Sequence, residues 1–467
     1  MGNGKKIWFI EKNRVSKYNR RPCFFIYSPT ENPEVFSFGD ERRKFVRKIS
    51  KNSSFLRYLF YNGQYNMLIR KAYRYRLYPT SDQEQDFAHN FGQARFVYNH
   101  FLAERKAFHD AHKNDEKKGL TYNDNANAMK SLKKDPEYVW LKIGHSQVLQ
   151  QSLKDLDQSY QNFFTKRAKF PKFHKKTDKQ SARYMQYVFV GDGWIDFPKV
   201  GKVKAVIHRL CEGKVKNVTV IKTKSGRYFA SVQVEVDVPE PGFDRDDVTV
   251  GIDMGLKDFV VTSDAVRIPA PKHLHKSQKR LTLLQRRLSR SQKGSKGREK
   301  ARLAVARQHE RIANQRSDFL HKTSNWLVMN YGLIGIENLN VCGMVKNHKL
   351  ARAISDASWG EFKRQLLYKG QWYGSRIVVI DRFYPSSREC SNCHHVLPEL
   401  KLSVREWDCP VCGAHHERDH NAAINIENEA KTRAGIARSN AGGEDVRPAV
   451  KSWQPSLKSE EAAWSLA

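Results

Sequence analysis

The chain has 467 residues, with 83 Lys and Arg against 49 Asp and Glu, which gives a formal net charge of +34. That length can hold about two to four domains. Such a charge is self-repulsive in a compact protein unless a polyanion offsets it, so nucleic acid is the expected partner. No apolar run approaches the roughly 18–20 residues that cross a bilayer, so we expect no membrane association and a cytoplasmic location.

The first clear pattern begins at Met67. Residues 71–79 (KAYRYRLYP) alternate basic with aromatic or apolar residues, which predicts a strand, and a long helix is expected after the break at 79–81. A second helical pattern, HSQVLQQSLKDLDQSYQNFF, leads into the basic linker KFPKFHKK. Aromatic residues among the cations of these two basic segments can stack on unpaired bases, although at least half of them are expected in the core.

The pattern then changes to a period of two. Residues 216–236 predict a hairpin that turns at Ser225-Gly226. From 248 the pattern is mixed α/β, with a very basic helical stretch over 273–329 that hinges at SQKGSKG. Contact with the backbone of a nucleic-acid duplex explains this stretch better than a solvated surface hairpin does. The segments LIGIENL and RIVVID predict further strands, and NAAINIENEAKTRA predicts a final helix.

Four of the seven cysteines have the spacing of a metal site. Cys390 and Cys393 are separated from Cys409 and Cys412 by 15 residues, and each pair encloses two residues. This is the spacing of a four-thiolate zinc ribbon. Four sulphur ligands fill a tetrahedral shell, so we expect a structural zinc ion and not a catalytic one.

Three carboxylates fall where the α/β part would bring them together. Asp253 ends the apolar run VTVGI, Glu337 follows LIGI, and Asp419 begins a helix after the cysteines. Three such acids can hold two Mg²⁺ ions, which activate water and stabilise the leaving oxygen in phosphodiester hydrolysis. Each acid also has an ordinary interpretation: an ion pair between Asp253 and Lys257, a turn cap at Glu337, and a helix N-cap at Asp419.

Together these motifs resemble the TnpB family, the transposon-encoded RNA-guided nucleases related to type V CRISPR effectors. The resemblance covers about residues 67–445 and rests on KAYRYRLYPT, FGQARFVYNH, VGIDMGLKDF, IGIENLNV, the cysteine segment and ERDHNAAINI. It implies an RNase H-like RuvC nuclease whose catalytic magnesium ligands are Asp253, Glu337 and Asp419. Arg418 and Asn421 match the family's motif, which implies that they position the scissile phosphate.

The resemblance also implies a multidomain α/β organisation. A β-barrel-like wedge domain (67–80 and 180–240) is interrupted by a helical recognition domain (81–179). The RuvC domain (248–385 and 415–435) contains the inserted zinc ribbon (386–414). An N-terminal extension (1–66) has no assigned role and is either an accessory nucleic-acid-binding arm or upstream sequence joined by start-site choice. The tail (436–467) is expected to be loosely ordered.

The function implied is cleavage of double-stranded DNA beside a short flanking motif, directed by a guide RNA from the transposon end of an insertion sequence. In this hypothesis base pairing reads the target sequence and the protein reads the flanking motif. We expect a monomer in complex with RNA. Two alternatives stay open at this point: a nuclease-silent guided repressor, and a guide-independent, transposase-like DNA-binding protein. The repressor predicts substitution among the three acids, and all three are present.

Overall fold

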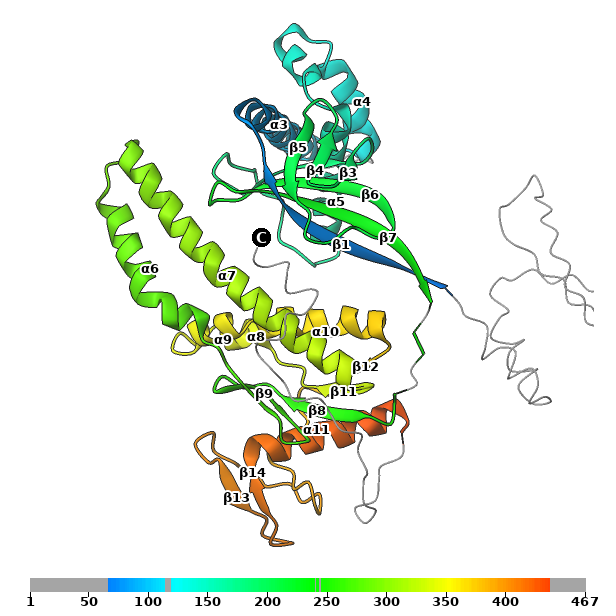
Figure 1. Ribbon diagram of the computed structural model, residues 1–467, viewed down its shortest axis with the longest axis vertical. Helices are drawn as coiled ribbons and strands as arrows, with labels where there is room; N and C mark the ends of the chain where they lie inside the picture. The colour runs from blue at the N-terminus through cyan, green and yellow to red at the C-terminus, as the bar shows by residue number, and fades with distance from the viewer. Residues whose placement is uncertain (1–65, 114–118, 240, 243–244, 437–467) are drawn as a thin grey trace, which may run out of the picture. The chain divides into compact units, whose positions relative to one another are not determined.

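A computed structural model describes residues 66–113, 119–239, 241–242 and 245–436. The predicted N-terminal extension and C-terminal tail lie outside these residues, apart from Asn66 and Ile436. The described residues form a mixed α/β structure with two large sheets, which confirms the α/β part of the predicted fold class (Figure 1). In this part of the chain no helix has the length and apolar character that a bilayer crossing requires.

The first sheet joins segments that are far apart in the sequence. Seven antiparallel strands are hydrogen-bonded in the order β2-β6-β7-β1-β5-β4-β3. The hairpin between β6 and β7 turns where predicted, with Gly226 in the left-handed region at φ +83°. The strands are β1 (Asn66–Tyr78), β2 (Gln180–Tyr184), β3 (Phe189–Gly191), β4 (Trp194–Phe197), β5 (Gly201–Val206), β6 (Lys214–Lys222) and β7 (Tyr228–Pro239).

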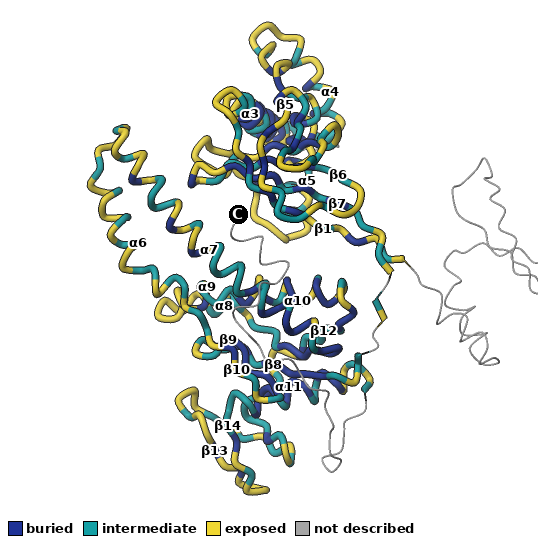
Figure 2. Tube along the Cα trace, in the orientation of Figure 1, coloured by how far each residue is buried: buried dark blue, intermediate teal, exposed yellow. Residues whose placement is uncertain are grey.

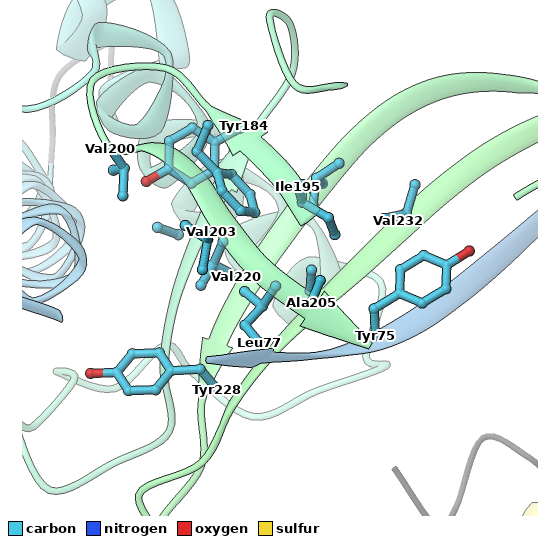
Figure 3. Close-up of a cluster of buried hydrophobic side chains, with 14 of the residues drawn as sticks. Tyr75, Leu77, Tyr184, Ile195, Val200, Val203, Ala205, Val220, Tyr228 and Val232 are labelled. Atoms are coloured by element: carbon cyan, nitrogen blue, oxygen red, sulfur yellow. The ribbon is translucent and has the colours of Figure 1, made fainter. Parts of the chain in front are cut away.

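Basic residues alternate with aromatic or apolar residues along β1, so the two kinds of side chain point to opposite faces of the sheet. Tyr73, Tyr75 and Leu77 belong to a buried apolar cluster, and the basic residues between them do not. Figure 3 shows Tyr75 and Leu77 in this cluster. The same cluster receives Tyr184, Ile195 and Val220 from other strands of the sheet. The aromatic residues of β1 are therefore mainly core residues and not a base-stacking platform.

A group of helices lies between β1 and β2 in the sequence. It contains α3 (Ser81–Ala111), α4 (Tyr122–Leu132), the 3₁₀ helix η1 (Pro136–Lys142) and α5 (Ser146–Phe164). Helix α3 begins at the predicted break, because Thr80 and Gln83 form a reciprocal capping box. Leu102, Leu149 and Leu153 are buried in the shared core of this group.

The second sheet has five strands in the order β10-β9-β8-β11-β12. Strands β8, β11 and β12 are parallel, whereas β9 and β10 pair antiparallel at one edge. The strands are β8 (Thr249–Asp253), β9 (Asp258–Thr262), β10 (Arg267–Pro269), β11 (Leu333–Ile336) and β12 (Arg376–Val379).

Helices cover both faces of this sheet. Val250, Ile252 and Ile336 face a core that contains Leu327 and Phe362, from α7 (Lys296–Asn330) and α10 (Trp359–Tyr373). Helix α6 (His273–Arg290) pairs with α7, and the break between them at 291–295 lies at the predicted hinge. Two short helices, α8 (Val341–Met344) and α9 (Ala351–Ala357), precede α10.

Helix α11 (Arg418–Ala434) lies on the opposite face of the sheet from α10 (Figure 1). Gly251 and Gly335 are register partners on β8 and β11, and both lie beneath α11. A Cβ atom on Gly251 would come within 2.0 Å of the carbonyl oxygen of Ala423, and one on Gly335 within 2.8 Å of that of Ile426. The helix can therefore approach these strands only because neither position carries a side chain.

We expect Gly251→Ala to lower the free energy of unfolding by about 1–3 kcal/mol, because the new methyl group meets helix backbone that cannot rotate away. Thermal unfolding of the purified protein measures this change. The matched control is Gly360→Ala in α10, where a Cβ would meet nothing within 4 Å and alanine is the better helix former. Equal stability of the two variants would contradict the close packing of α11 on β8.

Candidate active site and metal centre

Two of the predicted acids lie side by side at one edge of the five-stranded sheet. Ile252 and Ile336 are partners in the parallel register of β8 and β11. Asp253 and Glu337 follow them directly, so both acids are placed where two neighbouring strands end. Asp253 lies two residues after Gly251, and Glu337 lies two residues after Gly335. Their side chains are therefore on the face of the sheet that α11 covers.

The third acid comes from the first turn of α11. Asp419 lies one turn before Ala423, the residue packed over Gly251, which brings it towards the ends of the same strands. Glu417 occupies the N-cap position, so Asp419 is not the cap. Its carboxylate lies 3.3 Å from Nη1 of Arg405, a largely exposed side chain. Such an exposed pair contributes little stability.

The charges of Glu337 and Asp419 act on Asp253. Burial is the main cause that raises the pKa of Asp253 well above its ordinary value, and the negative charges of Glu337 and Asp419 raise it further. Burial likewise raises the pKa of Glu337, although a hydrogen bond from Ser386 and the charge of Arg418 oppose this. The ion pair of Asp253 with Lys257, the ordinary alternative, is not among these interactions. Arg418 and Arg405 therefore offset part of the negative charge of the three acids, and three oxygen donors in this setting suit Mg²⁺.

Arg418 and Asn421 lie in different surroundings. The Arg418 side chain donates to the carbonyl oxygen of Lys401 at 3.1 Å, and its charge reaches both Asp253 and Glu337. Asn421 is buried: it donates to the carbonyl oxygen of Glu389 at 2.7 Å and accepts from the backbone N–H of Ser391 at 3.0 Å. These contacts give Asn421 a role in holding the cysteine segment, and they do not favour the predicted contact with phosphate.

Sequence reasoning missed Ser386, which contacts Glu337 directly. Its hydroxyl donates to Oε1 of Glu337 at 2.9 Å. The backbone of Ser386 is held in turn by Asn425 of α11, whose amide donates to its carbonyl oxygen at 2.8 Å. Both residues are buried. Helix α11 therefore connects to two acids, directly through Asp419 and indirectly to Glu337 through Asn425 and Ser386.

The four predicted cysteines come together. Their sulphur atoms all lie within 4.8 Å of one another, and among the described residues they are the one such group of potential metal ligands. Two Sγ–Sγ distances are 3.6 Å (Cys390 to Cys412) and 3.5 Å (Cys393 to Cys409). A tetrahedral ion with Zn–S bonds of about 2.3 Å requires sulphurs about 3.8 Å apart. The cluster fits a metal ion with a closed ligand shell.

Both cysteine pairs sit in turns of the same kind. The residues four positions after the first cysteine of each pair, His394 and Gly413, both have left-handed backbone, at φ +60° and +70°. The short strands β13 (Glu406–Asp408) and β14 (His415–Glu417) close the segment. His416 on β14 was also missed by sequence reasoning, although its Nε2 lies 3.0 Å from the sulphur of Cys390.

Comparison with known proteins agrees with the motifs. A family model described as a probable transposase (OrfB_IS605) matches residues 231–348, and a Cas12f1-like TNB domain matches 359–426. A helix-turn-helix model matches 67–114. Within its described residues, however, the structure has one strand and one continuous helix, β1 and α3.

Curated relatives cover most of the chain. A protein of Streptomyces pristinaespiralis named "Putative RNA-guided DNA endonuclease" is 40% identical over 81% of this chain and 92% of its own. InsQ of Escherichia coli K12, with the same description, is 36% identical over 76% of this chain and 91% of its own. The chain belongs to the TnpB family. A solved Cas12f1–sgRNA–target DNA complex also matches, at 14% identity and a TM-score of 0.48, over 77% of this chain and 99% of that one.

We expect the purified protein to carry one tightly bound metal ion per chain at the four cysteines. Cys409→Ser removes a buried ligand and should release the ion and lower the soluble yield, because such sites contribute directly to folding. Elemental analysis of the purified protein measures the metal content. Cys342→Ser is the control, since Cys342 is exposed and outside the cluster. Wild-type protein without metal would contradict the site.

Proposed function

We propose that this chain is an RNA-guided DNA endonuclease that hydrolyses target DNA at Asp253, Glu337 and Asp419. The observation that carries the proposal is the register of β8 and β11, which ends at Ile252 and Ile336, the residues directly before the first two acids. Relatives at 36–40% identity that bear this activity in their names support it. The guide RNA would come from the transposon end, and the target is double-stranded DNA beside a short flanking motif.

In this proposal the five-stranded sheet with α11 is the RuvC nuclease domain, of the RNase H-like kind, and 386–414 is its inserted zinc ribbon. The seven-stranded sheet serves as the wedge domain, interrupted by the recognition helices α3 to α5. The closed set of four sulphur ligands favours Zn²⁺ at the ribbon. The protein would act as a monomer in complex with its RNA.

The residues of the site divide the work of hydrolysis. Bound Mg²⁺, in the proposed pair of ions, would activate water and stabilise the leaving oxygen. Asp253, Glu337 and Asp419 would hold the ions, and Ser386 would hold the carboxylate of Glu337 in place. Water would add to phosphorus as the bond to the leaving oxygen breaks, yielding a phosphate end and a hydroxyl end. Arg418 remains the candidate for contact with the scissile phosphate.

Two other functions are less well supported. A nuclease-silent repressor would not need the three acids, yet all are present with raised pKa values at two of them. A guide-independent transposase agrees with the description of one family model. This chain covers most of the length of two curated relatives, and both are named as endonucleases instead.

Asp253→Ala should abolish DNA cleavage while leaving guide RNA and DNA binding unchanged, because it removes a proposed metal ligand and no nucleic-acid contact. Purified protein bound to its co-purified RNA is assayed on a plasmid carrying the matching target. Asp192→Ala is the control, because Asp192 lies in an exposed turn and is not one of the three proposed metal ligands. Cleavage by the Asp253→Ala variant at the wild-type rate would overturn the site.

Ser386→Ala should weaken cleavage about 10–100-fold at low Mg²⁺, the usual effect of losing a side chain that orients a metal ligand. Raising the Mg²⁺ concentration should recover most of the rate. The neighbouring Ser387 is the matched control, because its side chain makes no hydrogen bond with the part of the chain that the structure describes. Identical Mg²⁺ dependence of the two alanine variants would show that Ser386 does not act on Glu337.

A further inference from the structure

We propose that the segment joining α5 to β2 binds unpaired nucleotides of the guide RNA, with bases stacked on Phe170 and Phe173 and phosphates held by the flanking cations. The inference rests on the proposed function and assigns part of the RNA contact. Residues 165–179 lie between the family-model matches at 67–114 and 231–348. Nearly all of this connection is exposed, and it is drawn largely in yellow in Figure 2.

The rings of Phe170 and Phe173 are exposed, and each also contacts a neighbouring helix. Phe170 is 40% exposed and Phe173 is 48% exposed. Phe163 and Tyr160 of α5 meet Phe170 edge to face, with ring centroids 5.3 and 5.6 Å away. Lys106 of α3 places its Nζ 5.8 Å from the Phe173 ring centroid. Each ring therefore has a contact with a neighbouring helix and still offers surface to a ligand.

The backbone of the segment is tied to α3. The Asn99 side chain donates to the carbonyl oxygen of His174 at 2.9 Å and accepts from its N–H at 2.8 Å. The His174 ring stacks on Tyr98 with centroids 3.9 Å apart, and Pro171, which lies between the two phenylalanines in the sequence, is buried. A platform held in this way costs little ordering free energy when a strand binds it.

The charge of the segment suits a phosphate backbone. Residues 166–176 contain six Lys and Arg and no Asp or Glu. None of these six cations forms an ion pair with an acid among the described residues. Their charges are therefore free to contact phosphates, which supply most of the affinity of such surfaces. The six are Lys166, Arg167, Lys169, Lys172, Lys175 and Lys176.

The surface also has a suitable hollow. An open groove of ≈ 560 Å³ is lined by Phe170, Phe173 and His174, together with Tyr98, three lysines of the segment and one acid, Asp178. This volume lies within the roughly 300–1,000 Å³ typical of ligand sites. Paired bases are stacked inside a duplex and cannot reach these rings, so the groove suits unpaired nucleotides.

We assign the occupant to guide RNA and not to a DNA strand. Phe170 and Phe173 are exposed apolar rings that line one groove, which is the kind of surface that a partner covers. An RNA-guided enzyme holds its guide before, during and after the encounter with DNA, whereas single-stranded DNA exists only while a target is open. The resident strand is therefore the one expected to cover the rings.

The test measures binding of a fluorescent twelve-nucleotide oligouridylate to the full chain freed of co-purified RNA, in the Asp253→Asn background. The double variant Phe170→Ala, Phe173→Ala should bind at least about tenfold more weakly, since a stacked base is lost at each ring. The double tryptophan variant at these positions should bind as the parent does. Phe383→Ala is the control, because Phe383 is 85% exposed and lies outside the segment.

A second variant tests the charges without touching the rings. Lys169→Gln with Lys172→Gln should reduce the slope of log K against log salt by about 1.4, the value for two phosphate contacts on a single strand. Ultraviolet cross-linking of the oligouridylate should modify the peptide that contains Phe170 and Phe173.

Unchanged affinity of the double alanine variant, or cross-links confined to other segments, would overturn the inference. A twelve-nucleotide oligothymidylate provides the DNA arm. If it binds these rings and oligouridylate does not, the assignment to RNA is wrong. Because Asp253→Asn already removes the proposed cleavage step, a failure here leaves the active-site proposal standing, and a failure of the cleavage test leaves this binding surface standing.

Discussion

Gly251 and Gly335 lie in register on adjacent strands, and the backbone of α11 rests on both of them. This contact sets the geometry of the candidate site. The acids Asp253 and Glu337 follow two residues later on the same face, and Asp419 lies one turn before the residue packed on Gly251. A larger side chain at either glycine would lift the helix and move one acid away from the other two. The site therefore depends on an absence of side chains as much as on the carboxylates themselves.

The cysteine segment also contacts α11 and helps to fix its position. It enters after β12 and returns the chain at Arg418, so its fold decides where the helix begins. Asn421 and Asn425 both donate to the carbonyl oxygen of Glu389, next to the first cysteine. A metal ion bound by the four sulphurs would fix the turn at Glu389 and Cys390. This turn is hydrogen-bonded to α11, the helix that carries Asp419. The ribbon can therefore affect chemistry without contacting the substrate.

Sequence patterns predicted most of the elements and the grouping of the four cysteines, because period, spacing and turn residues are local signals. They did not predict Ser386 or His416, since a side-chain partner across the fold has no local signature. The motif that contains Asn421 was visible in the sequence, but the backbone groups that its side chain bonds were not. The helix also begins at Arg418, one residue earlier than expected.

The aromatic residues show that alternation of basic and aromatic residues predicts burial in a strand but not in an irregular segment. In β1, Tyr73 and Tyr75 are buried and Tyr78 is 51% exposed, because the pleat sends alternate side chains to the core. In 165–179 there is no pleat, and Phe170 and Phe173 are both exposed. The expectation that at least half of these five rings belong to the core is thus wrong, with two buried. The difference comes from backbone hydrogen bonding, which composition does not reveal.

Charge separates the two kinds of surface in this protein. A chain of net charge +34 attracts nucleic acid over much of its surface, yet the candidate site is a cluster of carboxylates. A phosphodiester is repelled by such a cluster, so the basic surfaces can bring DNA near it but cannot place the scissile phosphate in it. Divalent cations held by the carboxylates would resolve this conflict, because they would supply positive charge where the phosphate has to lie. Burial is the main cause of the raised pKa of Asp253, and the neighbouring carboxylates add to it; ions bound there would lower this pKa. Binding and cleavage are thus expected to have separate electrostatic requirements, the first met by lysine and arginine and the second only when the cations are present.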